Sequence, residues 1–97
     1  MKAGIVGAGI SGLATAHAIL ARDPRADRTV FEARERVGGK VETERTAEGY
    51  LCEWGVNAFL DKVPKTLELC AEVGLAPLRG DESAKKRYVY SEGRLHQ

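Results

Sequence analysis

The sequence has few cysteines, few aromatic residues and no excess of charge of either sign. Cys52 and Cys70 are its only cysteines, and only 2 of its 97 residues are histidine, so neither a disulfide framework nor a zinc site is favoured. Both thiols are expected to be small packing residues of a protein in a reducing cytoplasm, rather than redox groups. With 15 Lys and Arg against 14 Asp and Glu, the formal net charge is +1. That balance gives no argument for nucleic acid as a partner.

A hydrophobic run of membrane-spanning length is also missing. The stretch 3–20 is poor in charge and follows Lys2, so a signal peptide and a membrane span are the two alternatives to consider. Glycines and polar residues interrupt this stretch, and no small-residue cleavage pattern follows before Arg22. Both alternatives are rejected. The remaining composition, 43% hydrophobic and 30% charged, is typical of a globular protein.

The region from Lys2 to Glu32 has the pattern of a strand, a glycine turn, a helix and a second strand. The first strand is expected at 2–6, the helix from about Ser11 to Arg22 and the second strand at 29–31. The unbroken apolar character of the first strand is typical of a central parallel strand that is buried on both faces. This order of elements is that of a βαβ unit that binds a dinucleotide.

Each part of this pattern has a physical reason. Gly7 permits the tight turn, Gly9 has no Cβ and lets a diphosphate approach the backbone, and Gly12 lets the helix pack closely on the strand. The helix N-terminus carries about half an elementary positive charge and favours an anion. Glu32 follows Gly12 by 20 residues, where its carboxylate can accept both ribose hydroxyls of an adenosine and repel a 2′-phosphate. Strand, helix, spacing and acid together favour this interpretation over an ordinary turn without a ligand.

A glycine doublet, Gly38-Gly39, follows the second strand and is bracketed by Arg36 and Lys40. Paired glycines can present consecutive N–H groups to phosphate oxygens, and the two cations can add a point charge or a fork. The alternative is a surface loop with solvated charges. Its position directly after the glycine turn and Glu32 favours a second anion-binding segment.

The glycine triplet, Glu32 and the run from Arg36 to Thr43 resemble the N-terminal signature of flavoproteins of the monoamine oxidase, phytoene desaturase and protoporphyrinogen oxidase superfamily. That resemblance implies that the doublet helps to hold the pyrophosphate of FAD. Arginine is the commoner residue at the position of Lys40, and lysine keeps the charge but loses the fork. The run from Ala84 to Tyr90, followed by Gly-Arg-Leu-His, is similar to protoporphyrinogen oxidases in particular.

A later segment resembles the part of protoporphyrinogen oxidases in which a glutamate and then Gly-Pro-Asn-Ser/Ala-Phe run beside the isoalloxazine end of the flavin. In this sequence Val56 replaces the proline, which removes a fixed φ and adds a free N–H. A proline at position 56 is therefore expected to preserve or improve the site. Trp54 and Phe59 can be core aromatics or pocket residues, and both alternatives remain open.

The resemblance implies a set of residues that bind the cofactor, FAD. It implies no metal, and no catalytic residue is assigned because the residues that grip a porphyrinogen lie outside these 97. The cofactor-binding set is Gly7, Ala8, Gly9, Ile10, Ser11, Gly12, Glu32, Ala33, Arg36, Gly38, Gly39, Lys40, Gly55, Val56, Asn57 and Ala58.

The fold class expected is α/β. Residues 1–97 are interpreted as an incomplete N-terminal part of an FAD/NAD(P)-binding domain of amine oxidase type, which begins with a Rossmann-like βαβ unit. A turn at Glu48-Gly49, a helix at 64–73 with Gly74 after its end, a strand at 84–90 and a turn at 91–93 into a last strand are expected to follow.

The function implied by the resemblance is an FAD-dependent oxidase of haem biosynthesis, which oxidises protoporphyrinogen IX or coproporphyrinogen III with molecular oxygen. The porphyrinogen and oxygen are the expected partners, the oligomeric state is open, and the 97-residue piece alone is expected to be inactive. The expected location is the cytoplasm, with contact to the cytoplasmic membrane surface left open. The alternatives are an amine oxidase or carotenoid desaturase of the same superfamily, and an inactive nucleotide-binding fragment.

Overall fold

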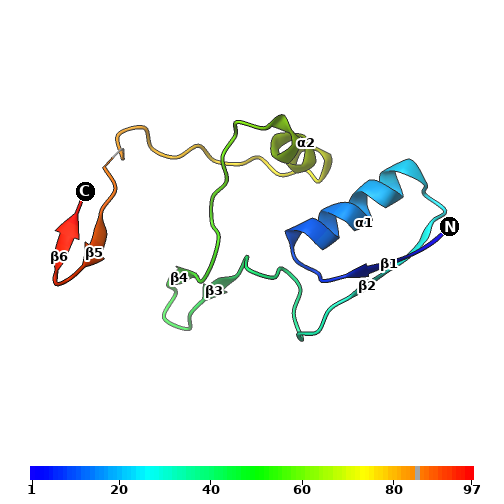
Figure 1. Cartoon of the computed structure of the whole chain (residues 1–97), viewed down its shortest axis with the longest axis horizontal. Helices are drawn as coiled ribbons and strands as arrows, with labels where there is room; N and C mark the ends of the chain where they lie inside the picture. Colours follow the sequence, from blue (N-terminus) through cyan, green and yellow to red (C-terminus); the bar gives the residue numbers. More distant parts are fainter. Residues whose placement is uncertain (85) are drawn as a thin grey trace. The chain divides into compact units, whose positions relative to one another are not determined.

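The computed structural model describes residues 1–84 and 86–97, which divide into the units Met1–Lys62 and Val63–Gln97 (Figure 1). The first unit contains β1 (Lys2–Val6), α1 (Ile10–Arg22), β2 (Asp27–Phe31), β3 (Thr43–Arg45) and β4 (Leu51–Glu53). The second contains α2 (Pro64–Glu72), β5 (Val89–Ser91) and β6 (Arg94–His96).

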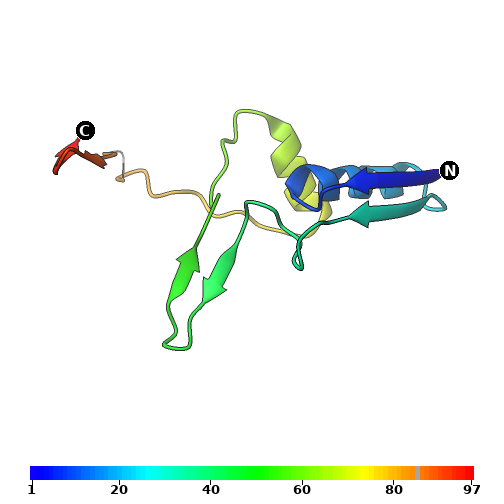
Figure 2. The same cartoon turned by 60° about the horizontal axis from the view of Figure 1, so that its bottom comes forward.

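The first unit begins with a parallel β1–α1–β2 arrangement, which confirms the expected βαβ unit. The two strands pair in register from Lys2↔Asp27 to Val6↔Phe31, and α1 lies along one face of the pair (Figure 2). Strand β2 begins two residues earlier than the apolar pattern indicates, because pairing with β1 extends it over Asp27 and Arg28. The carboxyl ends of both strands and the N-terminus of α1 therefore meet at one end of the unit.

Most apolar side chains of this βαβ unit are not covered. Among the described residues, the buried apolar ones are Ala8 and Ala26 alone, whereas the side chains at the ends of the two strands are open: Val6 is 90% exposed and Phe31 57%. Strand β1 pairs with β2 and with no other described strand. The expectation that β1 is buried on both faces is not met within this chain, because one helix and one neighbouring strand cannot cover it.

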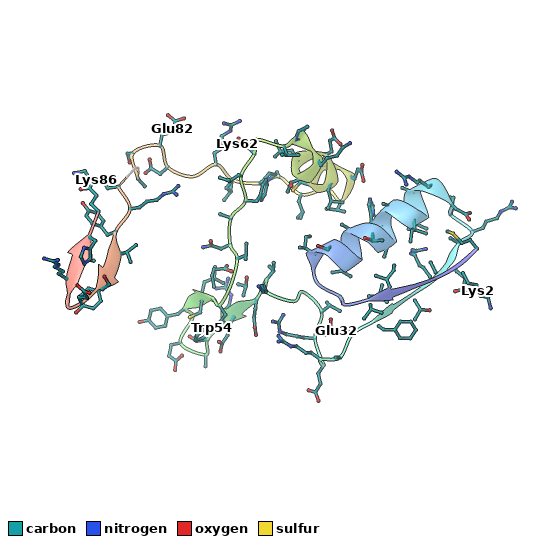
Figure 3. The ribbon with its side chains drawn as sticks, viewed as in Figure 1. Lys2, Glu32, Trp54, Lys62, Glu82 and Lys86 are labelled. Atoms are coloured by element: carbon teal, nitrogen blue, oxygen red, sulfur yellow. The ribbon has the colours of Figure 1, made fainter. Side chains whose placement is uncertain are left out.

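A short antiparallel hairpin of β3 and β4 follows the βαβ unit. The N–H of Thr46 donates to the carbonyl of Tyr50 (2.9 Å), and the turn uses Gly49 at φ +93°, as the Glu-Gly signal predicts. Trp54 follows β4 directly (Figure 3). Its indole donates to Glu44 Oε2 (2.6 Å), and the residue is 67% exposed. In this chain Trp54 is a surface residue of the hairpin and does not belong to a core.

The described residues of the second unit form one helix and one hairpin. Helix α2 starts at Pro64 and is followed by Gly74 at φ +75°, as predicted. The turn between β5 and β6 has Glu92 and Gly93 at φ +50° and +76°, which is the geometry of a two-residue type I′ hairpin. The strand expected at 84–90 is confirmed only from Val89, since β6 offers three partners; residue 85 lies outside the described residues.

Candidate functional site

Two glycines are required by the chain itself: Gly7 in the turn between β1 and α1, and Gly12 in the first turn of α1. Gly7 has φ +94°, and its N–H donates to the Phe31 carbonyl (2.7 Å). A Cβ added to Gly12 would overlap the Gly7 carbonyl oxygen. These contacts confirm the roles predicted for both glycines, the tight turn and the close approach of helix to strand.

Gly9 differs, because nothing among the described residues demands a glycine there. It caps α1 with φ −79° and ψ −178°, which any residue adopts. An added Cβ would meet only the Cα of Gly39, at an ordinary contact distance of 3.9 Å. The open space above Gly9 is therefore what a side chain would fill and what a ligand approaching the backbone would use.

Unpaired backbone donors surround this space. The first helical hydrogen bond of α1 runs from the Leu13 N–H to the Gly9 carbonyl (3.0 Å). Within the part of the chain that the structure describes, the N–H groups of residues 9–12 have no hydrogen-bond partner. Four free amides and the positive end of a helix dipole form a site suited to an anion.

The Glu32 side chain lies beside this turn (Figure 3), and both of its carboxylate oxygens accept backbone N–H groups. Oε2 accepts the Ala8 N–H (2.8 Å) and Oε1 the Arg34 N–H (3.0 Å). The Ala8 N–H, followed by that of Arg34, lowers the pKa of Glu32 below its usual 4.5. A carboxylate can accept about four hydrogen bonds, so lone pairs remain for two ribose hydroxyls.

Acid is expected to weaken the turn through Glu32. Because the pKa of Glu32 is lower folded than unfolded, its stabilisation is present above 4.5 and is lost as the pH falls through the lowered value. In thermal melts of the full-length protein, the difference between wild type and Glu32→Gln should be constant from about pH 5 to 8 and shrink below that range. A difference that grows toward acid pH would contradict this assignment.

The Gly38-Gly39 doublet packs directly on the glycine turn. The Gly38 N–H donates to the Ala8 carbonyl (2.8 Å), and a Cβ on Gly39 would lie 3.0 Å from the Gly9 Cα. Both glycines have positive φ, +109° and +60°. The sequence predicted two consecutive amides for a phosphate; since the amide of Gly38 donates within the chain, the two that face no described acceptor are those of Gly39 and Lys40.

The segment after β4 is bonded to the loop that carries the doublet. The Trp54 N–H donates to the Glu42 carbonyl (2.9 Å) and the Val56 N–H to the Lys40 carbonyl (3.2 Å). A Cβ on Gly55 would overlap that same Lys40 carbonyl oxygen. The expectation of a free N–H at Val56 was wrong, because the donor that proline lacks has a partner here.

This hydrogen bond reverses the result expected for a proline at position 56. Val56→Pro should weaken flavin binding by about 0.5–1.5 kcal/mol, the net value of one hydrogen bond, or up to about tenfold in affinity. Titration of the flavin-free full-length protein with FAD measures the change. Val56→Ala, which keeps the N–H, is the matched control and should bind FAD more tightly than the proline variant does; a proline variant that binds more tightly than both wild type and Val56→Ala would contradict the placement of this segment.

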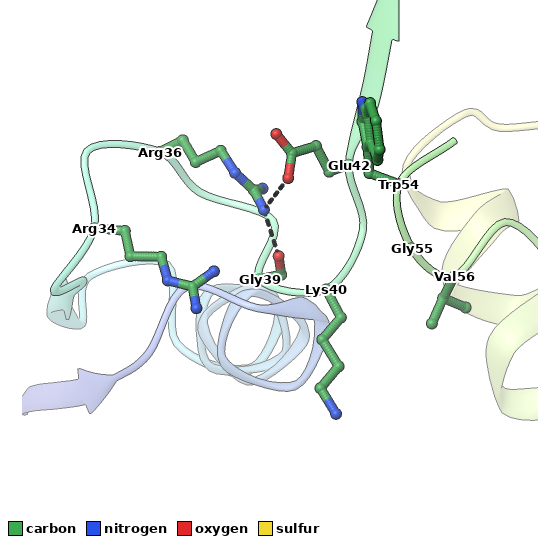
Figure 4. Close-up of a pocket in the computed structure, with 8 residues that line it drawn as sticks. All are labelled: Arg34, Arg36, Gly39, Lys40, Glu42, Trp54, Gly55 and Val56. Carbon is green, nitrogen blue, oxygen red and sulfur yellow. Dashed lines mark hydrogen bonds and ion pairs between the residues drawn. The ribbon is translucent and has the colours of Figure 1, made fainter. Parts of the chain in front are cut away.

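These segments enclose an open pocket of about 410 Å³ (Figure 4). Of the predicted cofactor residues, Arg36, Gly39, Lys40, Gly55 and Val56 line it, whereas Ala33, Asn57 and Ala58 are exposed outside the lining. The prediction missed Arg34, which lines the pocket and also draws down the pKa of Glu32. Its position two residues after the acid was the available signal. The other lining residues are Glu42 and Trp54.

Other kinds of site find no support in residues 1–84 and 86–97. They contain no group of three His, Cys, Asp or Glu side chains that could hold a metal ion. Cys52 and Cys70 are both free and half-buried. Neither described helix has the length and apolar character needed to cross a bilayer.

Sequence comparisons find one family and several relatives. The sequence model of the family "Flavin containing amine oxidoreductase" matches residues 10–97. The coproporphyrinogen III oxidase of Staphylococcus aureus is 34% identical over 92 residues, which are 95% of this chain and 20% of that protein. The chloroplastic protoporphyrinogen oxidase of Oryza sativa is 44% identical over 94 residues, which are 94% of this chain and 17% of the rice protein.

Two solved structures of oxidases superpose on most of this chain. A crystal structure described as a protoporphyrinogen oxidase, from Exiguobacterium sp. 255-15, superposes with a TM-score of 0.67 at 34% identity and covers 75% of this chain. A putrescine oxidase with bound putrescine superposes with a TM-score of 0.63, also at 34% identity, and covers 76%. Each match takes in 16% of the solved chain, so this chain spans about a fifth or less of the relatives that it matches.

Proposed function

The chain belongs to the flavin-containing amine oxidoreductase family, and from this premise we propose that it forms the N-terminal part of an FAD-dependent porphyrinogen oxidase of haem biosynthesis. Its substrate is protoporphyrinogen IX or coproporphyrinogen III, and molecular oxygen is the acceptor. Residues 1–97 supply the first portion of the FAD-binding domain. The observation that carries the proposal is Gly9, a glycine that the chain does not need for its own backbone or packing.

The residues present fit an FAD diphosphate and its adenosine ribose. A diphosphate above Gly9 would meet the unpaired amides of residues 9–12 from one side and those of Gly39 and Lys40 from the other. Glu32 is held by two backbone N–H groups at the distance along the chain where a ribose is expected. The Lys40 side chain, on the pocket wall, supplies a positive charge. The family's flavin, when bound, supplies hydride acceptance and the reaction with oxygen, and this chain binds and orients it.

The relatives support a porphyrinogen as the substrate. The near-neutral net charge gives no argument for a nucleic acid partner. We propose that the protein is located in the cytoplasm. Cell fractionation of the full-length protein measures whether it also binds to the membrane surface. The chain spans about a fifth of the length of these relatives. The enzymatic activity of the full-length protein is therefore part of this proposal.

An amine oxidase is the second candidate, and the superposition with putrescine oxidase favours it. The βαβ unit and the doublet serve the cofactor in either case, so they do not separate the two enzymes. The identity of 34–44% over nearly the whole chain to two porphyrinogen oxidases supports the first candidate.

The test is to express the complete reading frame that contains these residues and to assay the purified protein. We expect bound FAD and oxygen consumption with protoporphyrinogen IX or coproporphyrinogen III, followed by porphyrin fluorescence, and no turnover of putrescine. Glu32→Ala should weaken FAD binding by about ten- to a hundred-fold, the scale of hydrogen bonds to a charged group. A protein without flavin that binds NAD tightly would overturn the proposal, and turnover of the amine alone would favour the second candidate.

A further inference from the structure

The Arg36 guanidinium donates its hydrogen bonds to carbonyls of its own loop (Figure 4). Nη1 donates to the carbonyls of Val37 (3.1 Å) and Val41 (3.3 Å), and Nη2 donates to the carbonyl of Gly39 (2.7 Å). Nη2 also forms an ion pair with Glu42 Oε2 at 2.8 Å. Four contacts of a side chain with five N–H groups leave little capacity for a phosphate.

These bonds fix the direction of two peptide groups in the doublet loop. In a trans peptide the C=O and the following N–H point in opposite directions. The Val37 carbonyl faces Arg36, so the Gly38 N–H faces away from it and reaches the Ala8 carbonyl on the glycine turn. The Gly39 carbonyl also faces Arg36, so the Lys40 N–H is turned to the opposite side and has no described acceptor.

We propose that Arg36 is a positioning residue: by holding the Val37 and Gly39 carbonyls it docks the loop on the glycine turn and presents the Lys40 N–H to the FAD diphosphate, without touching a phosphate itself. This inference rests on the proposed function, since it assigns an FAD diphosphate to the space above Gly9. The positive charge next to the diphosphate then comes from Lys40, whose ammonium has no ion-pair partner among the described residues (Figure 4). The charge of Arg36 is paired with Glu42.

Lysine at position 36 separates positioning from direct charge. A lysine keeps the positive charge and would retain much of a phosphate contact, but a compact ammonium cannot replace a planar fork that holds three carbonyls. We expect Arg36→Lys and Arg36→Gln to weaken FAD binding by the same amount, about ten- to a hundred-fold for two to three lost hydrogen bonds. Near-wild-type affinity of Arg36→Lys would overturn the proposal.

The salt dependence of FAD affinity is the second measurement. Salt screens a direct charge–phosphate contact, so Lys40→Gln should flatten the plot of log Kd against log salt concentration. Arg36→Gln should shift this plot without changing its slope. Arg45→Gln removes the same charge from β3, outside the pocket lining, and should change neither; a flattened slope in Arg36→Gln would show a direct phosphate contact and contradict the proposal.

Amide exchange in flavin-free full-length protein tests the loop without any cofactor. In both Arg36 variants the Gly38 N–H should exchange at least about tenfold faster than in wild type, because its hydrogen bond to the Ala8 carbonyl opens. In Lys40→Gln the exchange rate of this N–H should stay that of wild type. Should Arg36→Gln fail to fold, Arg36→Lys carries the test, and Arg45→Gln in β3, outside the pocket lining, is the control that should leave both exchange and FAD affinity unchanged within about twofold. If no flavin binds but the Gly38 N–H exchanges faster as expected, the proposed function fails and the positioning of the loop by Arg36 stands. An unchanged exchange rate of this N–H in the Arg36 variants contradicts this inference alone.

Discussion

Gly9→Val is expected to abolish FAD binding by the full-length protein while leaving its melting temperature nearly unchanged. Position 9 has φ −79°, which valine adopts, and its Cβ has room against Gly39. The branched side chain would instead occupy the space in front of the free amides of α1, where the diphosphate is placed. Flavin absorbance per protein in the purified variant, together with a thermal melt of the flavin-free protein, measures both effects.

Gly12→Ala is the matched control for that experiment. Its Cβ would overlap the Gly7 carbonyl oxygen, so α1 must move away from β1 and the melting temperature of the flavin-free protein should fall. We expect Gly9→Val to lose flavin with an unchanged melting temperature. We expect Gly12→Ala to lose flavin with a lowered melting temperature. A Gly9→Val protein that retains stoichiometric FAD would contradict the placement of the diphosphate.

The 97-residue chain made alone is expected neither to hold FAD tightly nor to oxidise a porphyrinogen. Strand β1 keeps an edge that no described strand covers, and an unpaired backbone group that becomes buried costs about 1–3 kcal/mol. The large side chains Val6 and Phe31 stay mostly exposed, and the buried apolar residues described are two alanines. Whole domains are stable by only about 5–15 kcal/mol, so this little burial leaves no reserve.

Calorimetry and FAD titration of the isolated chain test this prediction. We expect a broad melt without a cooperative transition, and FAD affinity at least about a hundredfold below that of the full-length protein, a difference of about 3 kcal/mol. The full-length protein under the same conditions is the control. A cooperative melt with stoichiometric FAD, or oxygen-dependent porphyrin formation by the isolated chain, would contradict it.

The sequence predicts those parts of the fold that depend on local chemistry. The glycine turn, α1, the two hairpins and the end of α2 at Gly74 follow from φ preferences and apolar spacing, which act within a few residues. Strand β5 was predicted too long, because its extent depends on how many partners β6 offers. Pairing across the chain is not visible in the composition of either strand.

The site was predicted in its main residues, but not in how they are bonded. The spacing from Gly12 to Glu32 indicates a ribose contact, yet it does not show that Ala8 donates to that carboxylate. The Gly38, Arg36 and Val56 donors all turn to carbonyls of this chain. Main-chain carbonyls are common to every residue, so no sequence pattern marks which one a donor will reach.

The most direct test of the central claim is a crystal structure of the full-length protein with FAD bound. The measured quantity is the distance from the diphosphate oxygens to the backbone nitrogens of residues 9–12 and of Gly39 and Lys40. We expect hydrogen-bond distances of about 2.7–3.2 Å in both groups, with the ribose hydroxyls on Glu32 and the Arg36 guanidinium still bound to the Gly39 carbonyl. A diphosphate bound away from Gly9, or a structure in which Arg36 leaves its loop to grip a phosphate, would contradict this account.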